Sequence, residues 1–144
     1  MRRRYDLIHS MPRLTRAGVL ILAAALASPA IAGDTSASQL IAQFAAEAGS
    51  TPSAARGETL FTSRHTGGKP ETPSCTTCHT TNLRGTGKTR AGKVIEPMAL
   101  SANPQRFTDS AKVAKWFRRN CNTVLGRECS AGEKADVLAW LSSI

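Results

Sequence analysis

Cys75-Thr76-Thr77-Cys78-His79, near the middle of a 144-residue chain, is a C-x-x-C-H motif. Two thiols at this spacing can add across the vinyl groups of a haem, and the adjacent histidine then lies beneath the iron as an axial ligand. The motif predicts one covalently attached haem c. Cys75 and Cys78 would form the thioether bonds, and His79 would be the proximal iron ligand.

The N-terminal segment predicts export of the chain. Basic residues precede an apolar run over residues 18–27, and small residues follow up to Ala32, which is the order found in a secretory signal peptide. The apolar run is shorter than the about 20 residues that a membrane span needs. We expect a cleaved signal peptide (residues 1–32) and a periplasmic cytochrome c domain (residues 33–144) without stable membrane insertion. An uncleaved anchor and a start at Met11 are the alternatives.

The net charge of the mature chain is smaller than that of the whole sequence. The sequence has 19 Lys and Arg against 10 Asp and Glu, which is a formal charge of +9. Five of these basic residues and one acidic residue lie in the signal segment, which leaves 14 against nine, or +5. This removes most of the support for nucleic-acid binding. The remaining charge favours an acidic protein partner, and basic residues of a long central loop are candidates to meet it: Arg84, Lys88, Arg90 and Lys93.

A C-x-x-C pair also occurs in redox-active sites and in zinc sites. A redox pair lies between a strand and a helix, whereas this pair follows a loop rich in Thr, Pro and Gly. A zinc site would need Cys121 and Cys129 as further ligands, but thiols tend to oxidise in the oxidising compartment that receives an exported protein. If a haem takes Cys75 and Cys78, Cys121 and Cys129 are left as a pair. A disulfide-stapled zinc module is kept as an alternative.

Helical spacing of apolar residues predicts two helices before the motif. The first spans residues 36–48 and ends at Gly49-Ser50. The second begins with Thr51 as N-cap and a proline in its first turn, and it runs through Phe61.

Two further helices are predicted after the motif. One begins at Asp109, carries Val113, Trp116 and Phe117 on one face, and ends near residues 118–120, where basic side chains complement the helix dipole. The other opens with a capping box and has an apolar stripe, so the mature protein is predicted to be all-α. The residues of the box and the stripe are Ser130, Glu133, Val137, Leu138, Leu141 and Ile144, with Trp140 beside them.

Residues 80–107 show no sustained helical or strand period, and glycines and prolines interrupt them. A loop of this length is unusual inside a compact domain. A large apolar cofactor would supply the missing core, so this loop supports haem binding.

The arrangement around the motif resembles class I cytochromes c. In that fold an N-terminal helix with a glycine and an aromatic residue packs across a C-terminal helix that carries an aromatic residue. Gly57 and Phe61 match the first helix, and Trp140-Leu141 match the second. A glycine at the crossing lets the two backbones approach closely.

The sixth iron ligand separates two functions. Met or His in this position gives an electron carrier, whereas a weak or absent ligand leaves the iron open to small gases. The candidates are His65, Met98 and Asn120. Met98 follows Pro97, as an axial methionine often does, but it comes only 19 residues after His79. An asparagine at a helix end is by itself usually a C-cap.

Most of the mature chain resembles the sphaeroides haem protein (SHP) family. The matching stretches are residues 66–70, 73–79, 106–129 and 132–136, and Asn120-Cys121-Asn122 is the most specific of them. Members of the family are class I cytochromes c whose sixth ligand is the first asparagine of that run, beside a disulfide. The resemblance therefore implies Asn120 as the distal iron ligand and a disulfide between Cys121 and Cys129.

The resemblance also implies O2 binding, a role in NO or oxygen chemistry, and a dihaem cytochrome c as electron donor. A neutral amide is a weak ligand that prefers ferric iron, so reduction should release Asn120 and let O2, NO or CO bind. We expect a gas-binding monohaem cytochrome, and catalytic turnover of O2 or NO is left open. The alternative is an ordinary electron-transfer cytochrome c with Met98 or His65 as permanent sixth ligand.

Overall fold

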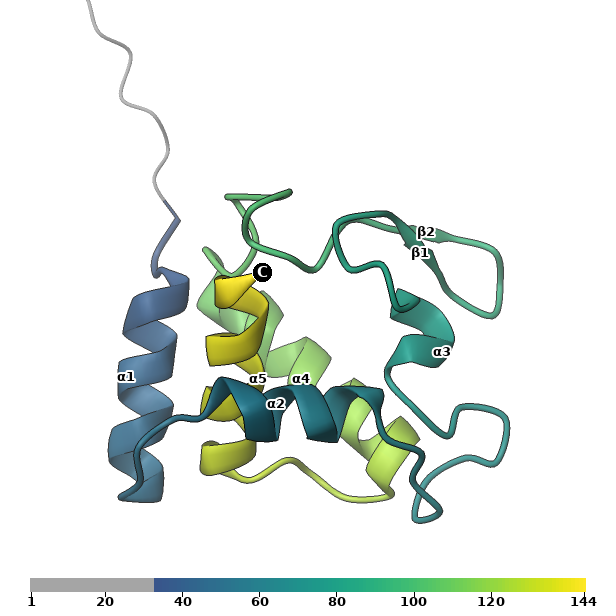
Figure 1. The fold of residues 1–144 in the computed structure, drawn as a ribbon, viewed down its shortest axis with the longest axis horizontal. Coiled ribbons are helices and arrows are strands. Elements are labelled where there is room, and N and C mark those ends of the chain that lie inside the picture. Colours follow the sequence, from purple (N-terminus) through teal and green to yellow (C-terminus); the bar gives the residue numbers. More distant parts are fainter. Residues whose placement is uncertain (1–32) are drawn as a thin grey trace, which may run out of the picture. The chain divides into compact units, whose positions relative to one another are not determined.

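The computed structural model describes residues 33–144, so the expected signal peptide lies outside the described residues. Within this range the chain forms five helices and one two-stranded antiparallel sheet, which confirms the all-α prediction apart from the short sheet (Figure 1). No helix in this range is both long and apolar enough to span a bilayer. The elements are α1 (Ala37–Ala48), α2 (Ala54–Thr62), α3 (Thr76–His79), β1 (Gly87–Lys88), β2 (Val94–Ile95), α4 (Ser110–Leu125) and α5 (Ala131–Ser143).

Most helix ends follow local capping signals in the sequence. Ser36 is the N-cap of α1, and Gly49 ends this helix with a left-handed φ of 60°. Asp109 caps α4 by accepting a hydrogen bond from a backbone amide of its first turn (2.8 Å). Ser130 and Glu133 form the predicted capping box at the start of α5.

The prediction that Thr51 caps the second helix is wrong. Ser53 is the N-cap of α2, and its hydroxyl accepts a hydrogen bond from the Arg56 amide (3.3 Å). A tertiary contact selects this residue, because the Ser53 amide donates to the buried carboxylate of Asp136 in α5 (2.6 Å). The Thr51 carbonyl instead accepts from the Arg56 guanidinium (2.8 Å).

The predicted end of the third long helix is also wrong, because α4 continues to Leu125. Asn120 therefore lies inside the helix, and Gly126, with a φ of 71°, is the C-cap. The helix continues because its buried face continues, with Cys121 and Val124 both buried.

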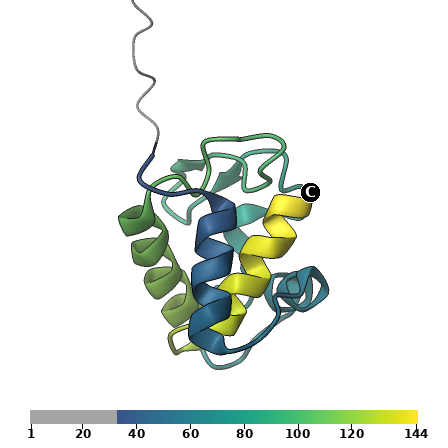
Figure 2. The same cartoon turned by 90° about the vertical axis from the view of Figure 1, so that its left-hand side faces the viewer.

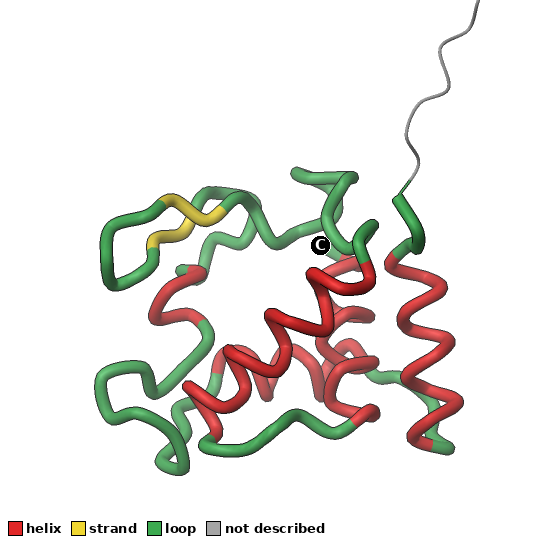
Figure 3. Tube along the Cα trace, turned by 180° about the vertical axis from the view of Figure 1, so that it is seen from behind, coloured by secondary structure: helices red, strands yellow, loops and turns green. Residues whose placement is uncertain are grey.

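One face of α4 packs into the protein, and Trp116 is not part of it. Val113 is buried, and Phe117, one turn later, contacts the cores on both sides of the helix. Trp116 lies beside this stripe and is 44% exposed, contrary to the prediction that it shares the buried face. Seen from behind, α4 runs across the near side of the molecule (Figure 3).

The crossing of α2 and α5 forms the centre of the fold, as predicted. A Cβ atom on Gly57 would overlap the backbone of Asp136 and Val137, so only glycine permits this approach. Next to the crossing, the rings of Phe61 and Trp140 lie 5.4 Å apart, centroid to centroid. The two backbones are therefore held at a distance that no larger residue at position 57 would allow.

Helix α1 packs against α4 and α5, and in Figure 2 it lies in front of them, facing the viewer. Its buried residues, Leu40 and Phe44, pack against Val113 of α4 and against Ala135 and Leu138 of α5. The ring of Phe44 also meets the ring of Phe117 edge to face, with 6.2 Å between the two centroids. Helices α1, α4 and α5 thus share one apolar core, and the motif with its sheet lies to one side of it (Figure 1).

Candidate haem site

The C-x-x-C-H motif forms the single turn of α3, and hydrogen bonds attach it to α2. The buried hydroxyl of Ser74, just before the turn, donates to the Phe61 carbonyl (3.1 Å) and lies 2.8 Å from the Thr76 hydroxyl. The ring of Phe61 lies 5.6 Å from that of His79, centroid to centroid. Because Phe61 also packs on Trp140, the helix crossing fixes the position of the histidine.

The imidazole of His79 has the properties of a metal ligand. Burial lowers its pKa to about 4, and the nearby Arg106 cation adds to this effect. The ring is therefore neutral at physiological pH, as a metal-ligating histidine must be. Its Nδ1 atom is buried and has no hydrogen-bond partner among the described residues. An orphaned buried nitrogen costs about 1–3 kcal/mol, and such an atom fits a ring whose environment is completed by a bound group.

The two motif cysteines are free and half-buried, and they do not resemble a redox-active pair. Burial raises the pKa of Cys75 to about 11. Redox-active cysteines in C-x-x-C motifs have lowered pKa values because the thiolate is the reactive form. The raised pKa of Cys75 therefore argues against a redox-active pair.

The apolar core beside the motif is lined by residues from α2, α4, α5 and the irregular segments. Phe61, Leu83 and Ala99 form its buried part together with residues of α5. Partly buried apolar side chains complete it, and a large apolar cofactor would cover their exposed surface. These are Ala54, Leu60, Cys75, Met98, Phe107, Phe117 and Ile144.

Arg106 is a half-buried cation at this site without a close carboxylate partner among the described residues. Its guanidinium donates to the sulfur of Met98 (2.7 Å) and, at the limit of hydrogen bonding, to the Glu96 carbonyl (3.5 Å). Burial lowers the pKa of Arg106. A buried cation needs a counter-charge, and a haem propionate has the right chemistry. The donor set, the apolar lining and this cation all fit a haem.

Two of the three candidate sixth ligands are already engaged by other groups. The Nε2 atom of His65 donates to the Leu60 carbonyl (2.8 Å), and the sulfur of Met98 accepts from Arg106. Asn120 is partly buried and follows Phe117 by three residues on α4. No hydrogen bond of its side chain occurs within residues 33–144, whereas the neighbouring Asn122 amide donates to the Arg118 carbonyl (2.7 Å).

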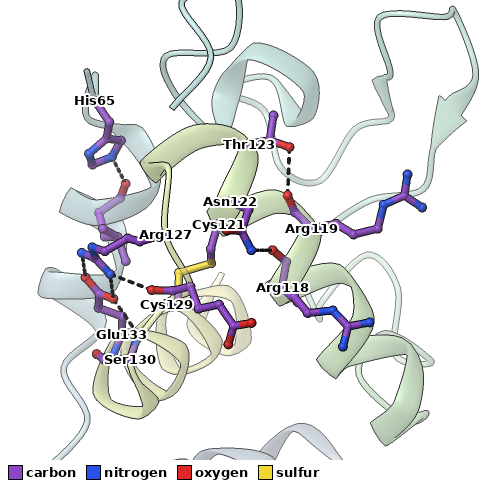
Figure 4. Close-up of a disulfide and its surroundings, with 12 residues drawn as sticks. His65, Arg118, Arg119, Cys121, Asn122, Thr123, Arg127, Cys129, Ser130 and Glu133 are labelled. Carbon is purple, nitrogen blue, oxygen red and sulfur yellow. Dashed lines mark hydrogen bonds and ion pairs between the residues drawn. A yellow bond between two sulfur atoms is a disulfide. The ribbon is translucent and has the colours of Figure 1, made fainter. Parts of the chain in front are cut away.

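A disulfide lies directly beside Asn120. It joins Cys121 to Cys129, and so connects α4 to the chain segment that leads into α5 (Figure 4). Both cysteines are buried. Because these cysteines are bonded to each other, they are not free to complete a zinc site with the motif. No group of three or more metal-ligating side chains occurs among the described residues.

The loop before the motif packs against the C-terminal end of α4. The Lys69 amide donates to the Thr123 carbonyl (2.8 Å), and a Cβ atom on Gly68 would overlap the same carbonyl. The approach to Cys75 and the helix that carries Asn120 are thus in direct backbone contact. The Gly-Gly pair in the sequence is the signal for this contact, but it does not reveal the partner.

Comparison with known proteins agrees with this geometry. Residues 47–141 match the model of a family described as a domain of unknown function (DUF1924). The cytochrome c-type protein SHP of Cereibacter sphaeroides is 61% identical over 124 residues, which are 86% of this chain and 96% of that protein. The chain belongs to the SHP family of c-type cytochromes.

Solved structures support the same family. The structure of oxidized SHP, described as an oxygen-binding cytochrome c, matches with a TM-score of 0.76 and 60% identity over 78% of this chain and all of that one. Oxidized cytochrome c'' of Methylophilus methylotrophus matches with a TM-score of 0.62 and 34% identity over 73% of this chain and 91% of that one. Like other members of the SHP family, this protein is a helical monohaem cytochrome with one covalent haem c.

Two residues of the site escape detection from the sequence. Arg106 is one of many basic residues in irregular segments, and Ser74 is one of several hydroxyl residues near the motif. Their roles depend on contacts with Met98 and Phe61, which lie eight and 13 residues away along the chain. No local pattern distinguishes them.

Proposed function

We propose that this cytochrome binds diatomic gases at a haem iron whose sixth ligand, the Asn120 side chain, leaves when the iron is reduced. The haem supplies the redox couple and the open coordination position. Asn120 closes this position in the ferric state, and an electron from another cytochrome opens it. O2, NO and CO are the ligands of the reduced protein, and turnover of O2 or NO is the reaction class that such a site would support.

The observation that supports Asn120 is the difference between the three candidates. His65 and Met98 already make polar contacts at 2.8 Å and 2.7 Å. The Asn120 amide makes none within the described residues. Asn120 lies about one turn after Phe117 on α4, and Phe117 packs against the same core as Cys75. Moving Asn120 to an iron ligand therefore breaks no existing hydrogen bond of that side chain.

The chemistry of the amide explains why reduction would release it. An amide oxygen is a hard, neutral donor, and ferric iron holds it more strongly than ferrous iron does. The disulfide at Cys121 limits how far Asn120 can move after release, so the ligand returns to the same place on oxidation. The buried position of Cys121 makes this restraint stiff.

The relatives support the two halves of this proposal. SHP of C. sphaeroides is described as an oxygen-binding cytochrome c. A solution structure of M. methylotrophus cytochrome c'', with a TM-score of 0.60 and 34% identity to this chain, is described as giving insight into haem-ligand detachment. The first concerns the gas, and the second concerns the departure of a ligand.

The location and the electron donor belong to the same proposal. Residues 1–32 act as a signal peptide that is removed after Ala32, and residues 33–144 form the mature periplasmic domain. Haem attachment through two thioethers agrees with an exported protein, and so does a disulfide. The donor is a c-type cytochrome, and the family resemblance suggests one with two haems.

Absorption spectra of the ferric and ferrous holoprotein, with and without CO, test this function. We expect a weak-ligand ferric spectrum that Asn120→Ala changes, and a five-coordinate ferrous form that binds CO in both proteins. The matched control is Asn122→Ala, since this asparagine lies two residues away on the exposed side of α4. A low-spin spectrum in both states with a near-infrared methionine–iron band would overturn the proposal and make Met98 the ligand.

A further inference from the structure

The exposed side of α4 carries a basic surface around a single exposed tryptophan. This surface, the α4 basic face, consists of Lys112, Lys115, Trp116, Arg118 and Arg119. All five are exposed, and α4 contains no acidic residue between Ser110 and Leu125. Trp116 is 44% exposed, and tryptophan is among the most strongly enriched residues at binding hot spots.

The charges of the α4 basic face are largely uncompensated. Lys112 lies 3.7 Å from the carboxylate of Asp109, and none of the other three cations forms an ion pair within the described residues. Figure 4 shows the guanidinium groups of Arg118 and Arg119 extending away from the disulfide. By contrast, the Arg127 guanidinium is paired with Glu133 at 2.7 Å.

The tryptophan is held in place by two of these cations. The Lys115 ammonium lies 5.8 Å from the centroid of a Trp116 ring, and the Arg119 guanidinium lies 5.3 Å from it. Such cation–π contacts restrain the ring and the cations together. Ordering an interface side chain costs about 0.5–1.5 kcal/mol on binding, and this cluster is already partly ordered before a partner arrives.

The α4 basic face borders the proposed distal ligand. Trp116 precedes Asn120 by four residues, so the two side chains are neighbours along one side of the helix. Helical side chains lean towards the N-terminus, which directs Asn120 towards the turn that carries Trp116. A protein seated on this face would lie against the helix whose ligand responds to reduction.

We propose that the α4 basic face is the docking site for an acidic surface of the protein that donates an electron to the haem. The inference rests on the proposed function, in which an electron from another protein opens the site. In the electron transfer the donor loses one electron and the ferric iron becomes ferrous. No bond is formed or broken on the donor. Nucleic acid is the weaker alternative, because the affinity for a phosphate backbone grows with the number of phosphates neutralised and this face has four cations.

The test is the rate at which a flavodoxin hydroquinone, a strongly acidic one-electron donor, reduces the ferric holoprotein. The variant is Lys115→Glu/Arg119→Glu. The control is Lys88→Glu/Lys93→Glu in the central loop, whose basic residues are the competing candidates to meet an acidic partner. Both variants change the net charge equally, and all four side chains are exposed. At about 0.01 M ionic strength, where the screening length is about 30 Å, we expect the α4 variant to be slowed about tenfold or more, and the control about threefold or less.

Several outcomes would overturn the docking site. Equal slowing of the two variants would mean that net charge alone steers the donor. Unchanged reduction rates for the α4 variant and for Trp116→Gln would show that the donor does not use this face. Tighter binding of the wild type to duplex DNA or to anionic vesicles than to flavodoxin would also exclude the docking site. Ferric spectra identical to the wild type show that each variant is folded.

A neutral small reductant separates this inference from the proposed function. A neutral flavin semiquinone should reduce the wild type and the α4 variant at the same rate. If this reduction opens the iron to CO while flavodoxin shows no preference for the α4 basic face, the docking site is wrong and the proposed function stands. If flavodoxin prefers the face but reduction never permits CO binding, the docking site stands and the gas-binding function is wrong.

Discussion

Gly57 of α2 lies directly against the carbonyl of Asp136 in α5, and a methyl group at position 57 would overlap this carbonyl. The same aspartate uses its side-chain carboxylate to accept from the Ser53 amide (2.6 Å) and from the Arg56 guanidinium (2.7 Å). Its backbone and its side chain therefore fix the start and the middle of α2 together. Because the C-x-x-C-H motif is attached to the end of α2 at Phe61, this contact also positions His79.

Gly57→Ala should destabilise the holoprotein by about 1–3 kcal/mol, since overpacking forces the two backbones apart. Chemical denaturation measures the change in the free energy of unfolding. The control is Gly132→Ala in α5, where the nearest atoms are at an ordinary 3.6 Å and alanine should be neutral or stabilising. Equal losses in both variants would show that the crossing has no special role.

Arg106→Gln should lower the reduction potential of the haem. A cation close to the site favours the reduced state because that state carries one negative charge more, and burial strengthens the effect. We expect a shift of roughly 30–60 mV, which is half to one decade in the one-electron equilibrium constant. Redox titration measures it.

Arg84→Gln is the matched control, because this arginine is exposed and its contact is the Ser101 hydroxyl (3.3 Å). An equal shift in both variants would mean that overall charge, and not the position of Arg106, sets the potential.

Removing the disulfide with Cys121→Ser/Cys129→Ser should lower the free energy of unfolding by about 2–3 kcal/mol, because the bond closes a short loop in the unfolded chain. The two cysteines are eight residues apart. The ferric spectrum should broaden or change as well, since the restraint beside Asn120 is lost. Circular dichroism during denaturation and absorption spectroscopy measure the two effects. An unchanged ferric spectrum with reduced stability would confine the disulfide to a structural role.

The Arg127–Glu133 pair should make stability depend on pH in the acid range. The hydrogen bond from Arg127 lowers the pKa of Glu133 below its ordinary 4.5, although burial opposes this. A carboxylate with a depressed folded-state pKa stabilises the protein above its unfolded-state pKa, and this stability is lost as the pH falls through the folded-state pKa.

Glu133→Gln removes this contribution and keeps an acceptor for the capping box. The difference in unfolding free energy between wild type and variant should therefore be largest near neutral pH and vanish below the folded-state pKa. A difference that does not change with pH would show that the pair contributes no proton linkage.

Local patterns account for the parts of the fold that the sequence predicts correctly. Asp109 and the capping box of Ser130 and Glu133 act through bonds within one helical turn, so neighbouring residues contain the necessary information. Gly57 was predictable for another reason, because the spacing of a glycine and an aromatic residue matches a known helix crossing. Errors occurred where a distant contact decides, as at Ser53 and at the end of α4.

The sequence by itself determined that the chain attaches a haem, because Cys75, Cys78 and His79 are adjacent and their chemistry needs no distant partner. It also determined the order and the number of the long helices. Only the tertiary structure decided that Met98 contacts Arg106, because this meeting depends on how an irregular loop packs over the core. It likewise decided that Trp116 faces solvent. Helical spacing alone does not say how wide the buried face of a helix is, since that width depends on which neighbours pack against it.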